Sequence, residues 1–399
     1  MKWEKVKLGN VTDSCLGKML DQNKNKGDYQ PYLANVNVRW GEFDLEDLPL
    51  MKFEESEQER YELKYGDLVI CEGGEPGRCA IWKEQIPNMK IQKALHRVRV
   101  HDCLDYRYLF YWFLLAGKTG ELDQYFTGAT IKHMPGQKLK EVVIDKPPLE
   151  IQHRIADILS AYDDLIENNQ KQIKLLEEAA QRLYKEWFVD LRFPGHENTK
   201  IVDGVPEGWN WCKLEDAIQL DPKVTLTKER MKQFIPMSAL STSSMVLDES
   251  QFTETTSNSG SKFQNGDTLL ARITPCLENG KTAYVSGLKS SEGAVGSTEY
   301  IVMRAKTINS YMVYLLARTD DFRQSAINSM SGSDGRQRVK SDKLKMLDYL
   351  HPTSELVEKF ENVEEPIFEK IYRLSKQMQQ AKQARDLLLP KLMSGEVEV

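Results

Sequence analysis

Apolar side chains recur every three or four positions along two stretches of the chain, and this spacing predicts two long helices. The first stripe runs from Ile151 to Trp187, with one four-residue shift near Asn169. The second runs from Leu356 to Leu392, and ten of its eleven positions lie 205 residues after their counterparts. A helix of about 37 residues spans on the order of 55 Å. A stripe this narrow on so long a helix needs a partner helix.

We therefore expect the two helices to pack against each other as an antiparallel coiled coil, since duplicated halves related by a pseudo-two-fold axis would run their helices in opposite directions. The alternative is that each helix packs on its own domain or on another chain. Pro366 interrupts the second stripe and lacks a backbone donor. This predicts that the continuous second helix starts at Pro366, after a separate short helix at 355–363. The expected seam residues are Ile155, Tyr162, Ile173, Leu183, Ile371, Met378 and Leu388.

A different pattern fills the chain before each long helix. Short β-branched and aromatic runs, such as 67–71 and 268–271, alternate with clusters of Gly, Pro, Asn and Ser, which predicts strands and turns. Residues 108–116 and 311–318 read as short helices. The fold class is therefore α+β, with two mixed domains that are each followed by a long helix. Pro and Gly accumulate in 193–208, which is the natural linker.

The two halves are copies of one another. Motifs recur in the same order at an offset that stays between 200 and 206 residues, which a chance match would not do. The matching pairs are Trp3 with Trp209, Tyr65–Ile70 with Asn265–Leu270, Tyr108–Tyr111 with Tyr311–Tyr314, Leu139–Lys140 with Leu344–Lys345, and Pro148 with Pro352.

Composition narrows the possible roles. The net charge of −6 excludes binding of polyanions by bulk charge, although a local basic face remains possible. Six cysteines without a CxxC pair favour a reducing compartment. The N-terminus has no apolar signal core, and the longest apolar run, 108–116, is too short to cross a membrane. We expect a cytoplasmic protein with no membrane partner.

Catalytic motifs are not evident. The sequence has no P-loop, no dinucleotide-binding glycine pattern and no metal-ligand cluster. Its one Pro-Pro pair, Pro147–Pro148, lacks the neighbours of an amino-methyltransferase loop and fits the start of a helix. Asp47 with Glu62 and Lys64 fits a nuclease signal only loosely. We expect no catalytic residue, no metal site and no cofactor in this chain.

Polar turn segments in both halves suggest recognition of DNA. Arg pairs with guanine, Asn and Gln pair with adenine, and Lys and Arg also anchor phosphates. Polar loops can equally be solvated surface. The loops differ between the halves while scaffold positions match, as expected if two copies read different sequences. The candidate DNA-binding residues are Asn35, Asn37, Arg39, Trp40, Arg78, Lys132, His133, Ser238, Ser241, Thr242, Arg272, Thr274, Arg336, Gln337, Arg338 and Lys340.

A set of motifs spans the chain: Trp3-x4-Leu8, Pro206-Glu207-Gly208-Trp209-x4-Leu214, the aromatic-Gly-Asp-apolar runs at 61–70 and 263–270, Pro147-Pro148-Leu149-Glu150-x-Gln152-x2-Ile155, Trp187–Gly195 and Leu389–Glu396. With these motifs, the whole chain resembles the specificity subunit of a type I restriction-modification system. The second half departs from the family pattern at Pro352–Glu355, which lacks the Pro-Pro pair and the Gln.

By this resemblance, residues 1–147 and 209–351 are target-recognition domains, each of which reads half of a split site in double-stranded DNA. Residues 148–192 and 352–399 are spacer helices, and 193–208 is the linker. The resemblance further implies docking to two methyltransferase subunits, which carry S-adenosylmethionine, and to restriction subunits in a larger complex.

Two other interpretations remain open. One is a single-chain DNA endonuclease that uses Asp47, Glu62 and Lys64. The other is a structural tether without a DNA role, whose long helices join partner proteins.

Overall fold

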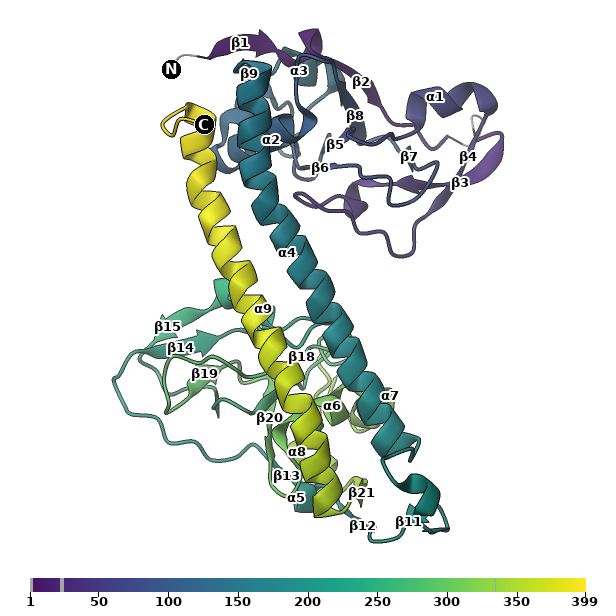
Figure 1. Ribbon diagram of the computed structural model, residues 1–399, viewed down its shortest axis with the longest axis vertical. Coiled ribbons are helices and arrows are strands. Elements are labelled where there is room, and N and C mark those ends of the chain that lie inside the picture. The colour runs from purple at the N-terminus through teal and green to yellow at the C-terminus, as the bar shows by residue number, and fades with distance from the viewer. Residues whose placement is uncertain (1–2, 22–24, 334) are drawn as a thin grey trace. The chain divides into compact units, whose positions relative to one another are not determined.

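The computed structural model describes residues 3–21, 25–333 and 335–399 (Figure 1). The chain divides into two structural units. Unit 1 takes the chain up to Leu165 together with Gln380–Val399, and unit 2 takes Ile166–Gln379. Each unit contains one mixed domain and one segment of each long helix, and each has its own hydrophobic core.

Unit 1 is built on an antiparallel sheet of order β2-β8-β5-β6, beside a smaller sheet of order β4-β3-β7 and the pair β1-β9. Its strands are β1 (Glu4–Lys7), β2 (Thr12–Leu16), β3 (Asp28–Leu33), β4 (Leu50–Phe53), β5 (Leu68–Cys71), β6 (Cys79–Ile81), β7 (Lys90–Ile91), β8 (Leu95–Val100) and β9 (Val143–Lys146). Its short helices are α1 (Gln58–Tyr61), α2 (Tyr106–Thr119) and α3 (Gly136–Glu141).

Unit 2 repeats this plan, with a sheet of order β13-β20-β17-β18, a second sheet of order β15-β14-β19-β16, and the pairs β12-β21 and β10-β11. Its strands are β10 (Ile201–Val202), β11 (Val205–Pro206), β12 (Asn210–Lys213), β13 (Ile218–Leu220), β14 (Lys232–Ile235), β15 (Thr253–Thr255), β16 (Ser261–Phe263), β17 (Thr268–Ala271), β18 (Thr282–Tyr284), β19 (Ala294–Gly296), β20 (Tyr300–Ala305) and β21 (Asp348–His351). Its short helices are α5 (Leu214–Ala217), α6 (Ser310–Arg318), α7 (Asp320–Asn328) and α8 (Ser341–Lys345).

The matched orders, β2-β8-β5-β6 and β13-β20-β17-β18, show the duplication in three dimensions and confirm the α+β class. The apolar runs predicted as strands form β5 and β17, and every residue of both strands is buried. The segments predicted as short helices form α2 and α6. The interval predicted as a linker is ordered, because it contains the β10-β11 hairpin and the ring of Phe193 packs 5.2 Å from that of Trp209.

The repeated Gly-Asp motif has a structural role. Gly66 adopts φ +86°, a conformation that favours glycine. The buried Asp67 then accepts a hydrogen bond from the Lys64 backbone N–H at 2.7 Å and binds the Arg99 guanidinium through two contacts of 2.7 Å. Asp267 does the same with Arg304, at 2.6 and 2.7 Å. In both copies, one carboxylate ties the turn before a core strand to the neighbouring strand.

The long helices are α4 (Leu149–Tyr184), which ends in a π-helical turn at Lys185–Val189, and α9 (Ser354–Ser394). The prediction that the second helix starts at Pro366 is wrong, because α9 runs through Pro366 without a break. Pro366 lies on the exposed side, where water can solvate the carbonyl that loses its partner. Phe360 and Phe368, on either side of it, are buried in the core of unit 2 and hold the helix in place.

Each unit pairs the two long helices in opposite directions, which confirms the antiparallel packing. In unit 1, Ile155 and Leu159 of α4 share a core with Leu389 and Leu392 near the end of α9. In unit 2, the later part of α4 shares a core with the first part of α9: Tyr184 and Trp187 lie against Phe360, with ring centroids 6.1 and 5.4 Å apart.

Polar contacts fix the register of the helix pair inside each unit. In unit 1, the Arg385 guanidinium binds the Asp163 carboxylate, which also accepts a hydrogen bond from the Tyr111 hydroxyl at 2.6 Å. In unit 2, Asn169 Nδ2 donates to Gln377 Oε1 at 3.2 Å. A shift of one helix against the other would leave the buried Asn169 amide and the half-buried Asp163 carboxylate without these partners.

The seam is wider than the predicted stripe. Of the expected seam residues, Ile155, Ile173 and Ile371 are buried, whereas Tyr162, Leu183, Met378 and Leu388 are only half-buried. Leu159, Ile166 and Tyr184, outside the stripe, are also buried. Both long helices pack against the mixed domains as well as against each other, so more than one face of each is covered.

Glu364 of α9 is fully buried, and neither carboxylate oxygen has a protein hydrogen-bond partner within the described part of the chain. Burial raises the pKa of Glu364 from its ordinary value of 4.5 to about 7. The folded protein therefore keeps a proton that the unfolded chain releases across this range. Consequently, the stability contribution of this group falls as the pH rises from 4.5 to 7.

We expect Glu364→Gln to stabilise the protein at pH 8 by roughly 1–3 kcal/mol, because it removes an unpaired buried charge. The gain should shrink towards pH 5, where the folded wild-type carboxyl is protonated. Urea denaturation followed by helix circular dichroism at both pH values measures the difference. Glu361→Gln, an exposed neighbour on the same helix, is the control and should change little. A pH-independent effect of Glu364→Gln would contradict this account.

Among the described residues, no helix combines the length and the apolar character needed to cross a bilayer.

Candidate DNA interface

Four of the candidate residues in unit 1 meet around the turn at Gly73–Glu75. Asn35 Nδ2 donates to the Gly73 carbonyl at 2.8 Å, and the Arg78 guanidinium binds Asn35 Oδ1 at 3.0 Å and Glu75 at 3.1 Å. Trp40 Nε1 donates to Glu75 at 2.7 Å. His133 joins them, because its backbone forms a β-bridge with Gly73.

Two other candidates in this unit, the buried Asn37 and the exposed Arg39, bond to their own loop. Asn37 is 6% exposed, and its side chain accepts from the Ala34 N–H at 2.9 Å and donates to the Asp44 carbonyl at 3.1 Å. These bonds hold the Asn37 side chain to its own loop, and a contact of Asn37 with DNA stays a prediction. Arg39 turns back onto the carbonyls of Val36 and Val38.

Residues 127–135 of unit 1, and residues 331–333 and 335–340 of unit 2, form what we call the recognition loops, and equivalent backbone hydrogen bonds close both. In unit 1, Thr127 and His133 exchange backbone hydrogen bonds of 2.7 and 2.9 Å, and Met134 N–H donates to the Glu72 carbonyl at 2.7 Å. In unit 2, the equivalent bonds join Ser331 and Arg338, both at 3.0 Å, and Val339 and Arg272, at 2.9 Å. His133 and Arg338 thus hold equivalent positions, as do Gly73 and Ile273, which both bridge to them.

The side chains at these equivalent positions differ between the two units. Arg338 is exposed and binds the Glu299 carboxylate through Nε and Nη2, at 2.7–3.0 Å. This hydrogen bonding lowers the pKa of Glu299 and keeps it ionised. In unit 1, the residue equivalent to Glu299 is Ala94, which accepts the matching backbone bond from Glu72 at 2.8 Å. Because Ala94 has no carboxylate, the ion pair between Arg338 and Glu299 cannot form at the equivalent place beside His133.

The remaining candidates in unit 2 support or flank its recognition loop. Arg272 donates to the Val339 carbonyl at 2.7 and 3.0 Å, and the Thr274 hydroxyl donates to the Gln337 carbonyl at 3.2 Å, so both hold the loop in place. Arg336 and Lys340 are exposed, and Gln337 is half-buried.

Ser238, Ser241 and Thr242 lie on a separate loop. This loop touches the turn after Thr274, because Lys281 Nζ donates to the Met237 carbonyl at 3.0 Å. The Ser241 hydroxyl accepts from two backbone N–H groups of its own loop, at 3.0 and 3.1 Å. In unit 1, Lys132 remains exposed, 3.5 Å from Asp123.

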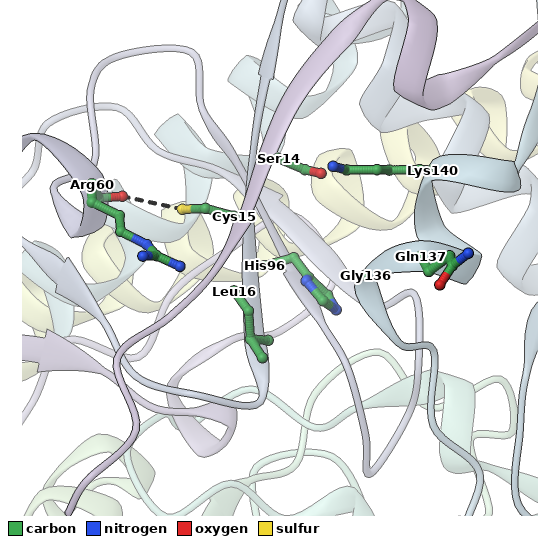
Figure 2. A pocket seen from close by; sticks show the side chains of 8 residues that line it. All are labelled: Ser14, Cys15, Leu16, Arg60, His96, Gly136, Gln137 and Lys140. Atoms are coloured by element: carbon green, nitrogen blue, oxygen red, sulfur yellow. Dashed lines mark hydrogen bonds between the residues drawn. The ribbon is translucent and has the colours of Figure 1, made fainter.

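Two surface cavities in unit 1 include residues that the sequence did not single out. One has a volume of about 420 Å³ and combines Asn35 and His133 with Gln92 and Lys93. The other, of about 540 Å³, is lined by Arg60, His96, Gln137 and Lys140 among others (Figure 2). Since their lining residues come from segments far apart in the chain, no local sequence signal could have assembled them.

The residues proposed for nuclease chemistry do not form a catalytic group. The Glu62 carboxylate binds Lys90 Nζ at 2.7 Å, and Lys90 is fully buried, so Glu62 neutralises an internal cation. Lys64 contributes its backbone N–H to the Asp67 turn. In the described ranges, no three His, Cys, Asp or Glu residues are arranged to hold a metal ion. This geometry argues for a structural role of Glu62.

Comparisons with known proteins agree with this organisation. Residues 1–178 match the family model of the type I restriction modification DNA specificity domain. The MjaIX specificity subunit of Methanocaldococcus jannaschii is 29% identical over 344 residues, which cover 84% of this chain and 78% of that protein. The EcoAI specificity subunit of Escherichia coli is 35% identical over 140 residues, 34% of this chain and 24% of that protein.

A solved structure shares the fold. The crystal structure of the type I restriction-modification S subunit from M. genitalium superposes with a TM-score of 0.59 at 16% identity, covering 98% of this chain and 96% of that one. Duplicated domains, paired long helices and these sequence matches lead to one conclusion: residues 1–178 match the type I restriction modification DNA specificity domain, and the chain is similar over most of its length to specificity subunits of type I restriction enzymes.

Proposed function

We propose that unit 1 and unit 2 each read one half of a bipartite sequence in double-stranded DNA. The observation that carries this proposal is the pair of recognition loops, which have the same backbone bonds but present His133 in one copy and Arg338 in the other. Two domains that recognise different sequences need the same loop backbone with different side chains, and the two recognition loops have this arrangement. Arg favours guanine, and its contact with a base edge contributes specificity.

We further propose that the chain is non-catalytic and works with two methyltransferase subunits, which bring S-adenosylmethionine, and with restriction subunits in the larger complex. The pairing of Glu62 with the buried Lys90 supports this division of labour, because it gives this residue of the nuclease alternative a structural role. The long helices are proposed to fix the gap between half-sites, because α4 and α9 each pass without a break through both units. This is consistent with the net charge of −6, since partner subunits can supply much of the positive surface that faces DNA.

Affinity purification from the native host, combined with methylome sequencing with and without the gene, tests the proposal. We expect a methyltransferase to co-purify and one split motif to lose methylation when the gene is deleted. Reintroducing the wild-type gene should restore methylation of the same motif. Co-purification with an unchanged methylome would instead support the structural tether.

A further inference from the structure

The larger of the two cavities described in unit 1 is lined in part by residues that follow the recognition loop in the chain. Ser14 and Cys15 of β2 and His96 of β8 form one side, and Gln137 and Lys140 of α3 form the other (Figure 2). Arg60 of α1 completes the wall, and its carbonyl accepts a hydrogen bond from Cys15 Sγ at 3.1 Å. The volume of about 540 Å³ is ample for a phosphate group and a part of the sugar attached to it.

The same place in unit 2 is bridged by hydrogen bonds. The strand registers pair Asp13 with Arg99 and Gln219 with Arg304, so Asp221 is the counterpart of Cys15. The recognition loops likewise make Ser341 the counterpart of Gly136. In unit 2, the Asp221 carboxylate accepts hydrogen bonds from the Ser341 hydroxyl and, at 3.0 Å, from the Val302 N–H. Cys15 and Gly136 cannot make this bridge, and in unit 1 both residues line the cavity.

The open space is lined for an anion. Its lining residues include two cations, Arg60 and Lys140, and no carboxylate. In the described parts of the chain, neither cation forms a salt bridge. Lys345, the counterpart of Lys140 in unit 2, is by contrast bound to Asp342 at 2.7 Å. Ser14 and Gln137 add a hydroxyl and an amide that can donate to anionic oxygens.

The buried, uncharged side chain of His96 forms part of the cavity wall. It is 1% exposed, and burial lowers its pKa, so the ring is neutral near pH 7. Its Nε2 lies 3.0 Å from the Met134 carbonyl, which makes Nε2 the protonated nitrogen. The His96 ring therefore links β8 to Met134, the residue that follows His133 in the recognition loop. Because this ring is neutral, the charged residues of the cavity lining are Arg60 and Lys140.

We propose that this cavity binds a phosphate group, and that the group is a backbone phosphodiester of the DNA whose bases face His133. The inference rests on the proposed function. Phosphate contacts set position and register without reading sequence. Because the Asp221 carboxylate takes the counterpart position in unit 2 and would repel a phosphate, this anchor would belong to one half-site only.

The salt dependence of DNA binding by the assembled methyltransferase complex tests the role of the cations. Lys140→Ala and Arg60→Ala should each weaken binding to all sequences alike and reduce the slope of log affinity against log salt by about one. Lys345→Ala, in the equivalent place but paired with Asp342, is the matched control and should leave the slope unchanged. If Lys140→Ala behaves like Lys345→Ala, the inference is overturned.

Alkylation of Cys15 by N-ethylmaleimide, followed by mass spectrometry, tests occupancy without any mutation. Bound target duplex should slow alkylation of Cys15 several-fold, while exposed Cys103 of the same unit serves as the reference. Inorganic phosphate at millimolar concentration should protect weakly or not at all. Protection by phosphate but not by duplex would assign the cavity to a free phosphate ligand and overturn the DNA source. If the complex binds its target sequence specifically but the duplex leaves Cys15 unprotected, the assignment of phosphate binding to this cavity is overturned and the proposed function stands. If the complex shows no sequence-specific binding, the proposed function is overturned.

Discussion

Replacing Arg338 with Ala should weaken binding of the assembled complex to one half-site by roughly 1–3 kcal/mol and leave the other half-site unaffected. Arg338 is exposed where the unit 2 recognition loop closes against Ser331. Glu299 holds one edge of its guanidinium through Nε and Nη2, which fixes the side chain before DNA arrives. A preformed side chain loses less conformational entropy on binding, so its contribution to affinity is larger.

Binding is best measured by fluorescence anisotropy on duplexes in which each half-site is altered separately. The reciprocal control is His133→Ala, which should affect only the half-site read by unit 1. Arg336→Ala should likewise weaken only the half-site read by unit 2. Glu299→Gln should relax the base preference of unit 2, because it removes the charge that positions Arg338. If Arg338→Ala or Arg336→Ala weakens every sequence equally, that residue contacts a phosphate and does not read a base.

Lengthening both long helices by four residues should widen the gap between the recognised half-sites by one or two base pairs. Four residues add about one helical turn, roughly 6 Å, and the duplex rises about 3.4 Å per base pair. The insertions belong between Leu165 and Ile166 in α4 and between Gln379 and Gln380 in α9, where the two units divide. Contacts inside each unit, such as Arg385 with Asp163, are then kept.

Methylome sequencing of cells that carry the doubly extended chain reads the new gap directly. An insertion in α4 alone is the control, because helices of unequal length cannot both stay paired in each unit. That variant should lose stability or methylation and should not acquire a clean new gap. A doubly extended chain that methylates the original motif would refute the spacer role of the helices.

The sequence was sufficient for features that depend on local periodicity. The stripe along 151–187 predicted α4 because a buried helix face repeats every three to four residues, and the apolar runs predicted β5 and β17. The prediction at Pro366 failed because the local cost of a proline was outweighed by the packing of Phe360 and Phe368. That packing depends on tertiary contacts that propensity does not contain.

The site was less accessible from sequence. Polar loop residues share one composition whether they face solvent or support the loop, so Asn37 and Arg338 looked alike until their hydrogen-bond partners were known. The cavity around Lys140 depends on residues from β2, α1, β8 and α3 meeting in space. Comparison of the two copies, residue by residue, shows that the Asp221 carboxylate of unit 2 stands where unit 1 has Cys15.

Unit 1 is assembled from both ends of the described chain, whereas unit 2 is one continuous stretch. Trp3 Nε1 donates to the Met393 carbonyl at 3.2 Å, and Leu389 and Leu392 complete the core around Ile155. During synthesis, the last residue of unit 2 is made before residues 380–399. Unit 2 can therefore fold before the last helical segment of unit 1 has been synthesised. A chain cut short before residue 380 would leave the apolar face of α4 in unit 1 uncovered, which marks such fragments for aggregation or proteolysis.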